Sequence, residues 1–263
     1  MRRSFTWKHL CYLLLTFCTL SCDFSSLDDA IIVSEVEDEF FVDLWENLDG
    51  LYGRELVVKI ESIKSEKCLN YRIDYQFSKD GNRLKIGLNS IIIPLDCLPG
   101  EAAAKADVNT GSLPNGLYSF NIDLKNTVSN TGQIIVNDDN YTVDIENKGI
   151  VMRRKELVRV PDGAIWGYAA YQQAADQTIA TQFVNDLKNI SKAPDTYRSG
   201  YYGHFIITSD RQITVNGQTA LSKPFLFSFQ EEEIKLKNLI ASYRQMYGNR
   251  LTIQFYNSKG EEL

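Results

Sequence analysis

Hydrophobic and polar residues alternate through much of the chain from residue 55 to residue 160, which is the pattern of strands with one buried face. The clearest run extends from Leu69 to Ser78. The segment 35–45, rich in acids and large hydrophobic residues, fits either a short helix or an edge strand. Further strands are expected at 56–60, 117–124, 132–136, 141–145 and 150–160. The first half of the chain is therefore predicted to be all β.

A tight turn is predicted at Asp80-Gly81, because this pair favours a two-residue type I′ turn between alternating runs. The register that follows pairs Phe77 with Leu84, Tyr75 with Ile86, Ile73 with Leu88 and Cys68 with Ile93.

Cys68 and Cys97 are expected to form a disulfide at the open end of this hairpin. Pro94 ends the second strand shortly before Cys97, so the register brings the two sulfurs together. A bridge of this span stabilises a fold by about 3 to 4 kcal/mol in the chain-entropy model. The alternative is a pair of free, buried thiols.

Helical periodicity first occurs after Pro161-Asp162-Gly163, where a domain boundary is expected. One helix has an apolar stripe from Ile179 to Ile190, with Asp176 as its predicted N-cap. A second helix starts near the glutamates 231–233 and is expected to end at Gly248. Strands are expected at 164–171, 202–208, 211–215, 225–229 and 251–255.

The N-terminus has the pattern of an export signal. Arg2, Arg3 and Lys8 precede a short apolar run that ends at Ser21-Cys22, and this run is too short to span a bilayer. The segment 20–22 resembles a bacterial lipobox, which implies that Cys22 is acylated and becomes the first residue of the mature protein. An ordinary cleaved signal and an uncleaved anchor are the alternatives. The Ser- and Asp-rich residues that follow predict a flexible tether at 22–34.

The charge and the inventory of reactive residues restrict the possible functions. Without residues 1–21 the chain has 25 basic and 34 acidic residues, a net charge of −9, so nucleic acid is not an expected partner. The brief run Arg153-Arg154-Lys155 is interpreted as a solvated strand end or linker. Outside the leader His204 is the only histidine, expected in the middle of a strand, so catalytic triads and multi-histidine zinc sites are not predicted. No cofactor, metal or catalytic residue is assigned.

Two resemblances suggest a fold class. The stretch 113–118, Leu-Pro-Asn-Gly-Leu-Tyr, resembles the tyrosine corner of immunoglobulin-like (Ig-like) sandwiches, although Phe120 stands where antibody-type domains have a cysteine. The order β-α-β-β-β-α-β after residue 161 resembles a ferredoxin-like α+β domain with an added strand. The expected organisation is a signal peptide at 1–21, a tether at 22–34, an Ig-like β-sandwich at 35–160 and a ferredoxin-like domain at 161–263.

Together these features resemble the two-domain lipoproteins of unknown function found in Bacteroidetes. The resemblance implies a non-catalytic lipoprotein of the cell envelope, anchored through Cys22, on the periplasmic or surface face of the outer membrane. Its partner would be a glycan, a peptide or an envelope protein. A sheet covered by helices on one side only would expose aromatic residues on the other, so Trp166, Tyr168, Tyr202 and His204 are the candidate binding residues. The alternative is that these rings fill the core of the sheet and that His204 is a strand residue with a satisfied ring nitrogen. The alternative function is a hydrolase that attacks polysaccharide or peptidoglycan with paired carboxylates.

Overall fold

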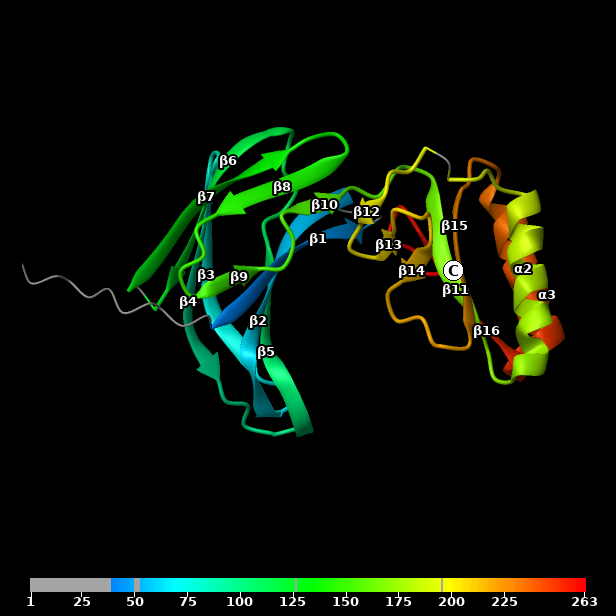
Figure 1. The fold of residues 1–263 in the computed structure, drawn as a ribbon, viewed down its shortest axis with the longest axis horizontal. Helices are drawn as coiled ribbons and strands as arrows, with labels where there is room; N and C mark the ends of the chain where they lie inside the picture. The colour runs from blue at the N-terminus through cyan, green and yellow to red at the C-terminus, as the bar shows by residue number, and fades with distance from the viewer. Residues whose placement is uncertain (1–38, 50–52, 126, 195) are drawn as a thin grey trace, which may run out of the picture. The chain divides into compact units, whose positions relative to one another are not determined.

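A computed structural model of the chain describes residues 39–49, 53–125, 127–194 and 196–263, which belong to one compact unit (Figure 1). The predicted leader and tether, with Cys22, lie outside these residues. Within these residues the fold is mostly β, with one large curled sheet, two small sheets and two α-helices. No helix within these residues is long and apolar enough to cross a membrane.

The large sheet contains ten strands in the order β10-β8-β7-β6-β4-β3-β5-β2-β1-β9. A single residue pair, Arg72 with Lys105, joins β3 to β5, so the sheet nearly divides there into groups of six and four strands. One hydrophobic core lies inside the curl and draws residues from both groups, such as Leu44 and Ile60 from one and Phe120 and Ile134 from the other. The ten strands are β1 (Phe40–Asp49), β2 (Gly53–Cys68), β3 (Arg72–Asp80), β4 (Arg83–Ile92), β5 (Pro99–Asn109), β6 (Gly116–Leu124), β7 (Val128–Val136), β8 (Asn140–Ile145), β9 (Ile150–Met152) and β10 (Glu156–Val158).

The C-terminal part contains two small sheets and both α-helices. The sheet β15-β11-β16 carries α2 and α3 on one face, where Phe183 and Ile240 from the helices pack on Phe225 and Phe255 from the sheet. Strands β15 and β16 both run antiparallel to β11, which lies between them. The elements are β11 (Ala164–Tyr171), α2 (Gln177–Asn189), β12 (Gly200–Tyr201), β13 (Phe205–Ile207), β14 (Ile213–Val215), β15 (Ser222–Ser228), α3 (Glu233–Tyr247) and β16 (Leu251–Asn257), with 3₁₀ turns at Ala174–Asp176 and Gly248–Arg250.

The disulfide is confirmed, but the register argument that led to it is wrong. Cys68 and Cys97 are bonded, with their Cα atoms 5.4 Å apart. However, Cys68 ends β2 and is paired with Pro99 of β5, while the hairpin itself begins only at Arg72. The turn residues are Gly81 and Asn82, because Asp80 still pairs with Arg83.

The hairpin register consequently differs by two residues from the predicted one, so that Phe77 faces Ile86 and not Leu84. A bulge between Asp74 and Tyr75 shifts it by one more. Because a shift of two residues keeps each side chain on its face, Leu84, Ile86 and Leu88 are buried as the alternation predicts.

Several other local predictions can be compared with the structure. The segment 35–45 contributes to a strand, β1, and the expected strand 150–160 is two short strands at opposite edges of the large sheet. Strand β5 is not predicted from the sequence, because it contains four alanines together with Pro, Gly, Asp and Asn, which have low strand propensity. Both helices form. Gly248 caps α3, whereas Asp176 occupies the N-cap position of α2 without a capping hydrogen bond and instead binds Arg250.

Candidate functional site

The four predicted binding residues do not form an exposed aromatic face. Trp166 and Tyr202 are buried, and Tyr168 and His204 are half-buried. The helix-free face of the β15-β11-β16 sheet is covered by residues of the β12-β13-β14 sheet, with Leu48, Val158 and Val160 completing the cluster. An exposed face would require the two helices to be the only cover of this sheet. When the small sheet covers these rings, their apolar surface is removed from water, and this burial stabilises the packing of the two sheets.

His204 lies in a bend before β13, and not within a strand as predicted. Its ring packs between Trp45 and Trp166, with ring centroids 4.5 Å and 5.4 Å away. Gly203, at φ +80°, allows the backbone to pass directly against the Trp45 ring. Burial lowers the pKa of His204, although Nε2 lies 2.8 Å from the backbone oxygen of Glu46, a contact that opposes the shift. This histidine is therefore a packed residue at the junction between the large sheet, which carries Trp45, and the C-terminal part, which carries Trp166.

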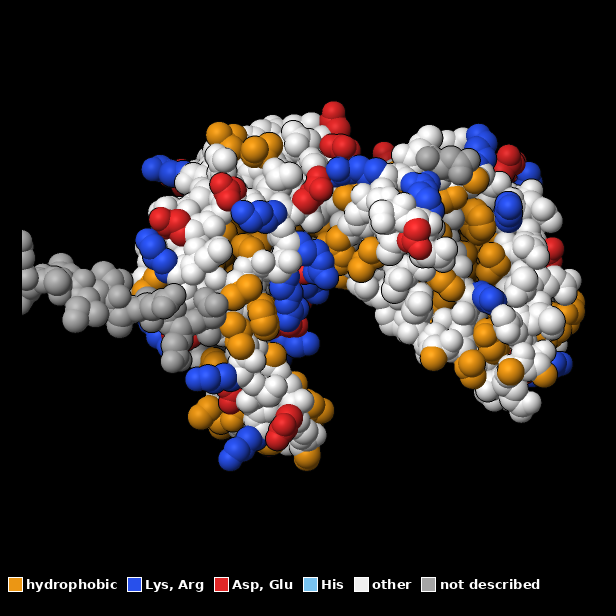
Figure 2. All heavy atoms as spheres, viewed as in Figure 1, with side chains coloured by type: hydrophobic (Ala, Val, Ile, Leu, Met, Phe, Trp, Pro, Cys, Tyr) orange, Lys and Arg blue, Asp and Glu red, His pale blue; other side chains and the backbone are white. Residues whose placement is uncertain are grey.

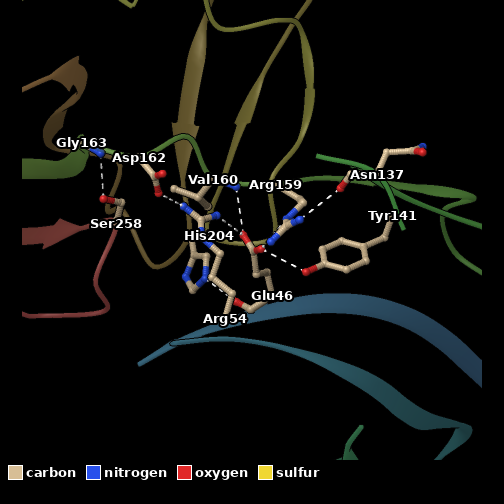
Figure 3. A network of polar contacts seen from close by, with 10 residues as sticks. All are labelled: Glu46, Arg54, Asn137, Tyr141, Arg159, Val160, Asp162, Gly163, His204 and Ser258. Atoms are coloured by element: carbon tan, nitrogen blue, oxygen red, sulfur yellow. Dashed lines mark hydrogen bonds and ion pairs between the residues drawn. The ribbon is translucent and has the colours of Figure 1, made fainter. Parts of the chain in front are cut away.

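Glu46 is the centre of a buried polar network at the same junction (Figure 3). Its side chain is fully buried, and both carboxylate oxygens accept two hydrogen bonds. Oε1 accepts from the hydroxyl of Tyr141 and from Nε of Arg159, each at 3.2 Å. Oε2 accepts from Arg54 at 3.1 Å and from the backbone N–H of Val160 at 3.0 Å.

The Glu46 network links distant parts of the chain. Arg54 also binds Asp162 at 2.6 Å, and Arg159 donates to the backbone oxygen of Asn137 at 3.1 Å. Burial, followed by the charge of Glu46, raises the pKa of Tyr141 and keeps its hydroxyl protonated as a donor. With all four acceptor positions of the Glu46 carboxylate used, the network holds strands together and offers no free group to a substrate.

Aromatic and basic side chains meet on the outer face of β1 and β2. We call this group the ring–cation surface: Phe41, Trp45 and Tyr201, with Lys59, Arg153 and Arg154. Each cation lies over one ring: Lys59 over Trp45 at 4.4 Å, Arg153 over Phe41 at 4.6 Å and Arg154 over Tyr201 at 3.8 Å from the centroid. Figure 2 shows Lys and Arg side chains gathered over the region where Figure 1 places β1 and β2.

Carboxylates hold the cations of the ring–cation surface in position. Arg153 binds Glu61 at 2.8 Å, and Arg154 forms a short ion pair with Asp43. Burial raises the pKa of Asp43, while the charge of Arg154 opposes that shift. The arginine side chains nevertheless remain about two-fifths exposed, at 40% and 39%. The surface therefore presents fixed guanidinium groups and half-buried rings to solvent.

Sequence reasoning missed the ring–cation surface. The sequence predicts only a solvated strand end or linker for Arg153 to Lys155, and either a short helix or an edge strand for residues 35–45. The available signal was the spacing of Phe41, Asp43 and Trp45, which alternate with buried Phe40, Val42 and Leu44. That alternation would have placed two aromatic residues on an outer strand face. No sequence pattern indicated that the arginines lie over it.

A shallow hollow between β7 and β8 contains two carboxylates, Asp144 and Glu146. Glycoside hydrolysis needs one carboxyl group that stays protonated near neutral pH. A hydrogen bond from the backbone N–H of Thr131 lowers the pKa of Glu146, and Asp144 pairs with Lys155 at 3.6 Å. This hollow therefore does not favour the hydrolase alternative.

Comparisons with known proteins add no assignment, since no family model, curated protein or solved structure matches the chain. Across the part of the chain that the structure describes, no group of three or more His, Cys, Asp or Glu side chains is arranged to hold a metal ion. The candidate site is therefore the ring–cation surface and the junction next to it.

Proposed function

We propose that this protein is a non-catalytic lipoprotein of the cell envelope, anchored through Cys22, which binds a glycan, peptide or envelope protein. The observation that carries the proposal is the Cys68–Cys97 disulfide together with the export pattern at the N-terminus. Disulfides persist in oxidising compartments outside the cytoplasm, where an envelope lipoprotein is folded. Two independent features, one in the leader and one in the folded part, thus agree on export.

We further propose that the ring–cation surface contacts the ligand, and that the ligand carries carboxylate groups, as an acidic glycan or peptide does. An exposed guanidinium group of arginine can bind a carboxylate with two parallel hydrogen bonds. Asp43 and Glu61 hold the guanidinium groups in place before a ligand arrives. This pre-organisation reduces the entropy that binding must overcome.

The finer fold assignment is also a proposal: an Ig-like sandwich followed by a ferredoxin-like domain. The near-division of the large sheet supports the first part, as does the hydrogen bond from the Tyr118 hydroxyl to the backbone oxygen of Pro114 at 2.9 Å, which is the bond of a tyrosine corner. Strands β15 and β16 on either side of β11, connected through α3, support the second. A complete ferredoxin-like sheet would need a fourth strand, and β12–β14 instead form a separate sheet.

Labelling with palmitate tests the anchor. Wild-type protein should incorporate the label and fractionate with membranes, whereas Cys22→Ala should do neither or remain as an uncut precursor. Equal labelling of the two proteins would contradict the lipoprotein assignment.

Calorimetry with a uronic-acid oligosaccharide tests the ligand surface, with the neutral sugar of the same length as the reference. The full-length protein in detergent should bind the acidic sugar, and Arg153→Gln or Arg154→Gln should weaken binding about tenfold by removing charged hydrogen bonds. Lys85→Gln is the matched control, because Lys85 also pairs with a carboxylate, that of Asp123, but lies outside the ring–cation surface. Equal affinity in all variants, or no binding, would contradict the assignment of this surface.

A further inference from the structure

Five aliphatic side chains are exposed at one end of the large sheet, where β4 connects to β5. We call them the apolar tip: Leu69, Ile92, Ile93, Leu95 and Leu98. Leu95 is fully exposed and Ile93 is 74% exposed. In Figure 1 the connection from β4 to β5 runs along the lower end of this sheet, and Figure 2 shows hydrophobic side chains there. Scattered exposed hydrophobic residues need no explanation, but a group this exposed on adjacent loops marks a contact surface.

The backbone of the apolar tip is held in place on both sides. The disulfide joins Cys68 to Cys97, and the backbone N–H of Leu69 donates to the oxygen of Leu98 at 2.9 Å. The Asn70 side chain donates to the backbone oxygen of Asp96 at 2.7 Å and accepts from the N–H of Leu98 at 3.1 Å. The aliphatic groups are therefore presented by a fixed loop, which loses little conformational freedom on binding.

The chain enters the folded part at the same end of the sheet as the apolar tip. Strand β1 begins at Phe40, which pairs with Ser62 of β2, and Cys68 lies six residues further along β2. At a strand rise of about 3.3 Å per residue, the tip is roughly 20 Å beyond this entry point. Sixteen residues lie between Cys22 and Glu39, and the seventeen steps of chain from one to the other can span at most about 60 Å. A lipid on Cys22 therefore leaves enough chain for the tip to reach the same bilayer.

We propose that the apolar tip inserts into the surface of the bilayer that holds the lipid anchor, which rests on the proposed acylation of Cys22. Protruding aliphatic side chains fit among acyl chains at the headgroup boundary. The charges nearby are mixed, with Lys64 and Lys67 close to Glu66 and Asp96, so the interaction is driven by apolar contact and not by anionic lipid. A second contact with the bilayer would fix the orientation of the folded part above the membrane.

Quenching of tryptophan fluorescence tests this insertion. The full chain with Leu95→Trp is reconstituted into phosphatidylcholine vesicles with brominated acyl chains, and the wild-type signal is subtracted to remove the native tryptophans. The added fluorescence should be strongly quenched relative to unbrominated vesicles. Adding Ile93→Asp should remove most of this quenching, and anionic lipid should not be needed.

Leu117→Trp is the matched control. Leu117 is 55% exposed, like residues of the tip, but it lies two residues before Ser119, which pairs with Arg83 at the opposite end of β4. Its fluorescence should be the same in both kinds of vesicle. Equal quenching of the two reporters, or none at residue 95, would overturn the proposal.

The failure of this inference is distinguishable from failure of the anchor. If palmitate labels Cys22 and the reporter at residue 95 is not quenched, the anchor stands and the insertion is wrong. If Cys22 is not labelled but the reporter is quenched, the tip binds bilayers and the anchor is wrong. If Leu95→Asp instead dissociates a dimer in sedimentation, a second copy of the chain covers the tip and the bilayer proposal is overturned.

Discussion

Replacing Glu46 by Gln should destabilise the protein more than any replacement of a surface acid. The carboxylate is fully buried and compensates the guanidinium groups of Arg54 and Arg159, whose side chains are only 21% and 18% exposed. Removing one partner of a buried ion pair leaves uncompensated charge and costs about 3 to 5 kcal/mol. Because Arg54 keeps its second partner, Asp162, we expect the lower end of this range, about 3 kcal/mol.

In a protein of this size, such a loss lowers Tm by roughly 6 to 12 °C. Urea unfolding followed by tryptophan fluorescence, together with calorimetry, would measure the free energy of unfolding and Tm for the wild type and for Glu46→Gln.

Glu61→Gln is the control for this measurement. Glu61 also pairs with two cations, Lys105 and Arg153, but its side chain is 28% exposed. Partly exposed pairs contribute at most about 1 kcal/mol. If Glu46→Gln and Glu61→Gln lower the free energy of unfolding by amounts that agree within about 0.5 kcal/mol, the buried network is not a main source of stability at the junction.

Three further predictions concern the disulfide, the tyrosine corner and the buried histidine. Breaking the Cys68–Cys97 bond by the double change to serine should lower the free energy of unfolding by about 3 to 4 kcal/mol, and reductant should have no further effect on that variant. Tyr118→Phe should cost about 1 kcal/mol, whereas Tyr75→Phe, whose hydroxyl bond is exposed, should cost almost nothing in the same urea titration. Burial lowers the pKa of His204, so the stability from its neutral ring is complete above the unfolded value of 6.5 and is lost as pH falls through the folded pKa. Unfolding free energies measured from about pH 7 down to about pH 5, above the range where most carboxylates titrate, should fall for the wild type and stay flat for His204→Gln; parallel curves would contradict this reasoning.

The alternation of side chains predicted most strands and the buried face of β4, but not that of the run before it, where Ile73 is buried while Leu69 and Tyr75 are exposed. Leu84, Ile86 and Leu88 are buried as expected, even though the hairpin register is two residues from the one the turn implied. The reason is geometric, because a side-chain period of two is unchanged by a shift of two. The same local signals placed both helices and the Gly248 cap.

Tertiary structure alone decided which faces are covered and which residues meet. The helix-free face around Trp166 looked available in sequence, but three short strands cover it, and short strands carry little periodic signal. Glu46 looked like one acid among many in a mixed segment. The pairing of β1 with β2 brings Arg54 to it, and the curling of the large sheet brings Tyr141 and Arg159 to it from the far edge. Cys68 and Cys97 meet through β2 and β5, and not through the hairpin. Local propensity acts over a few residues, whereas these contacts join residues 8 to 113 positions apart, so packing determines them.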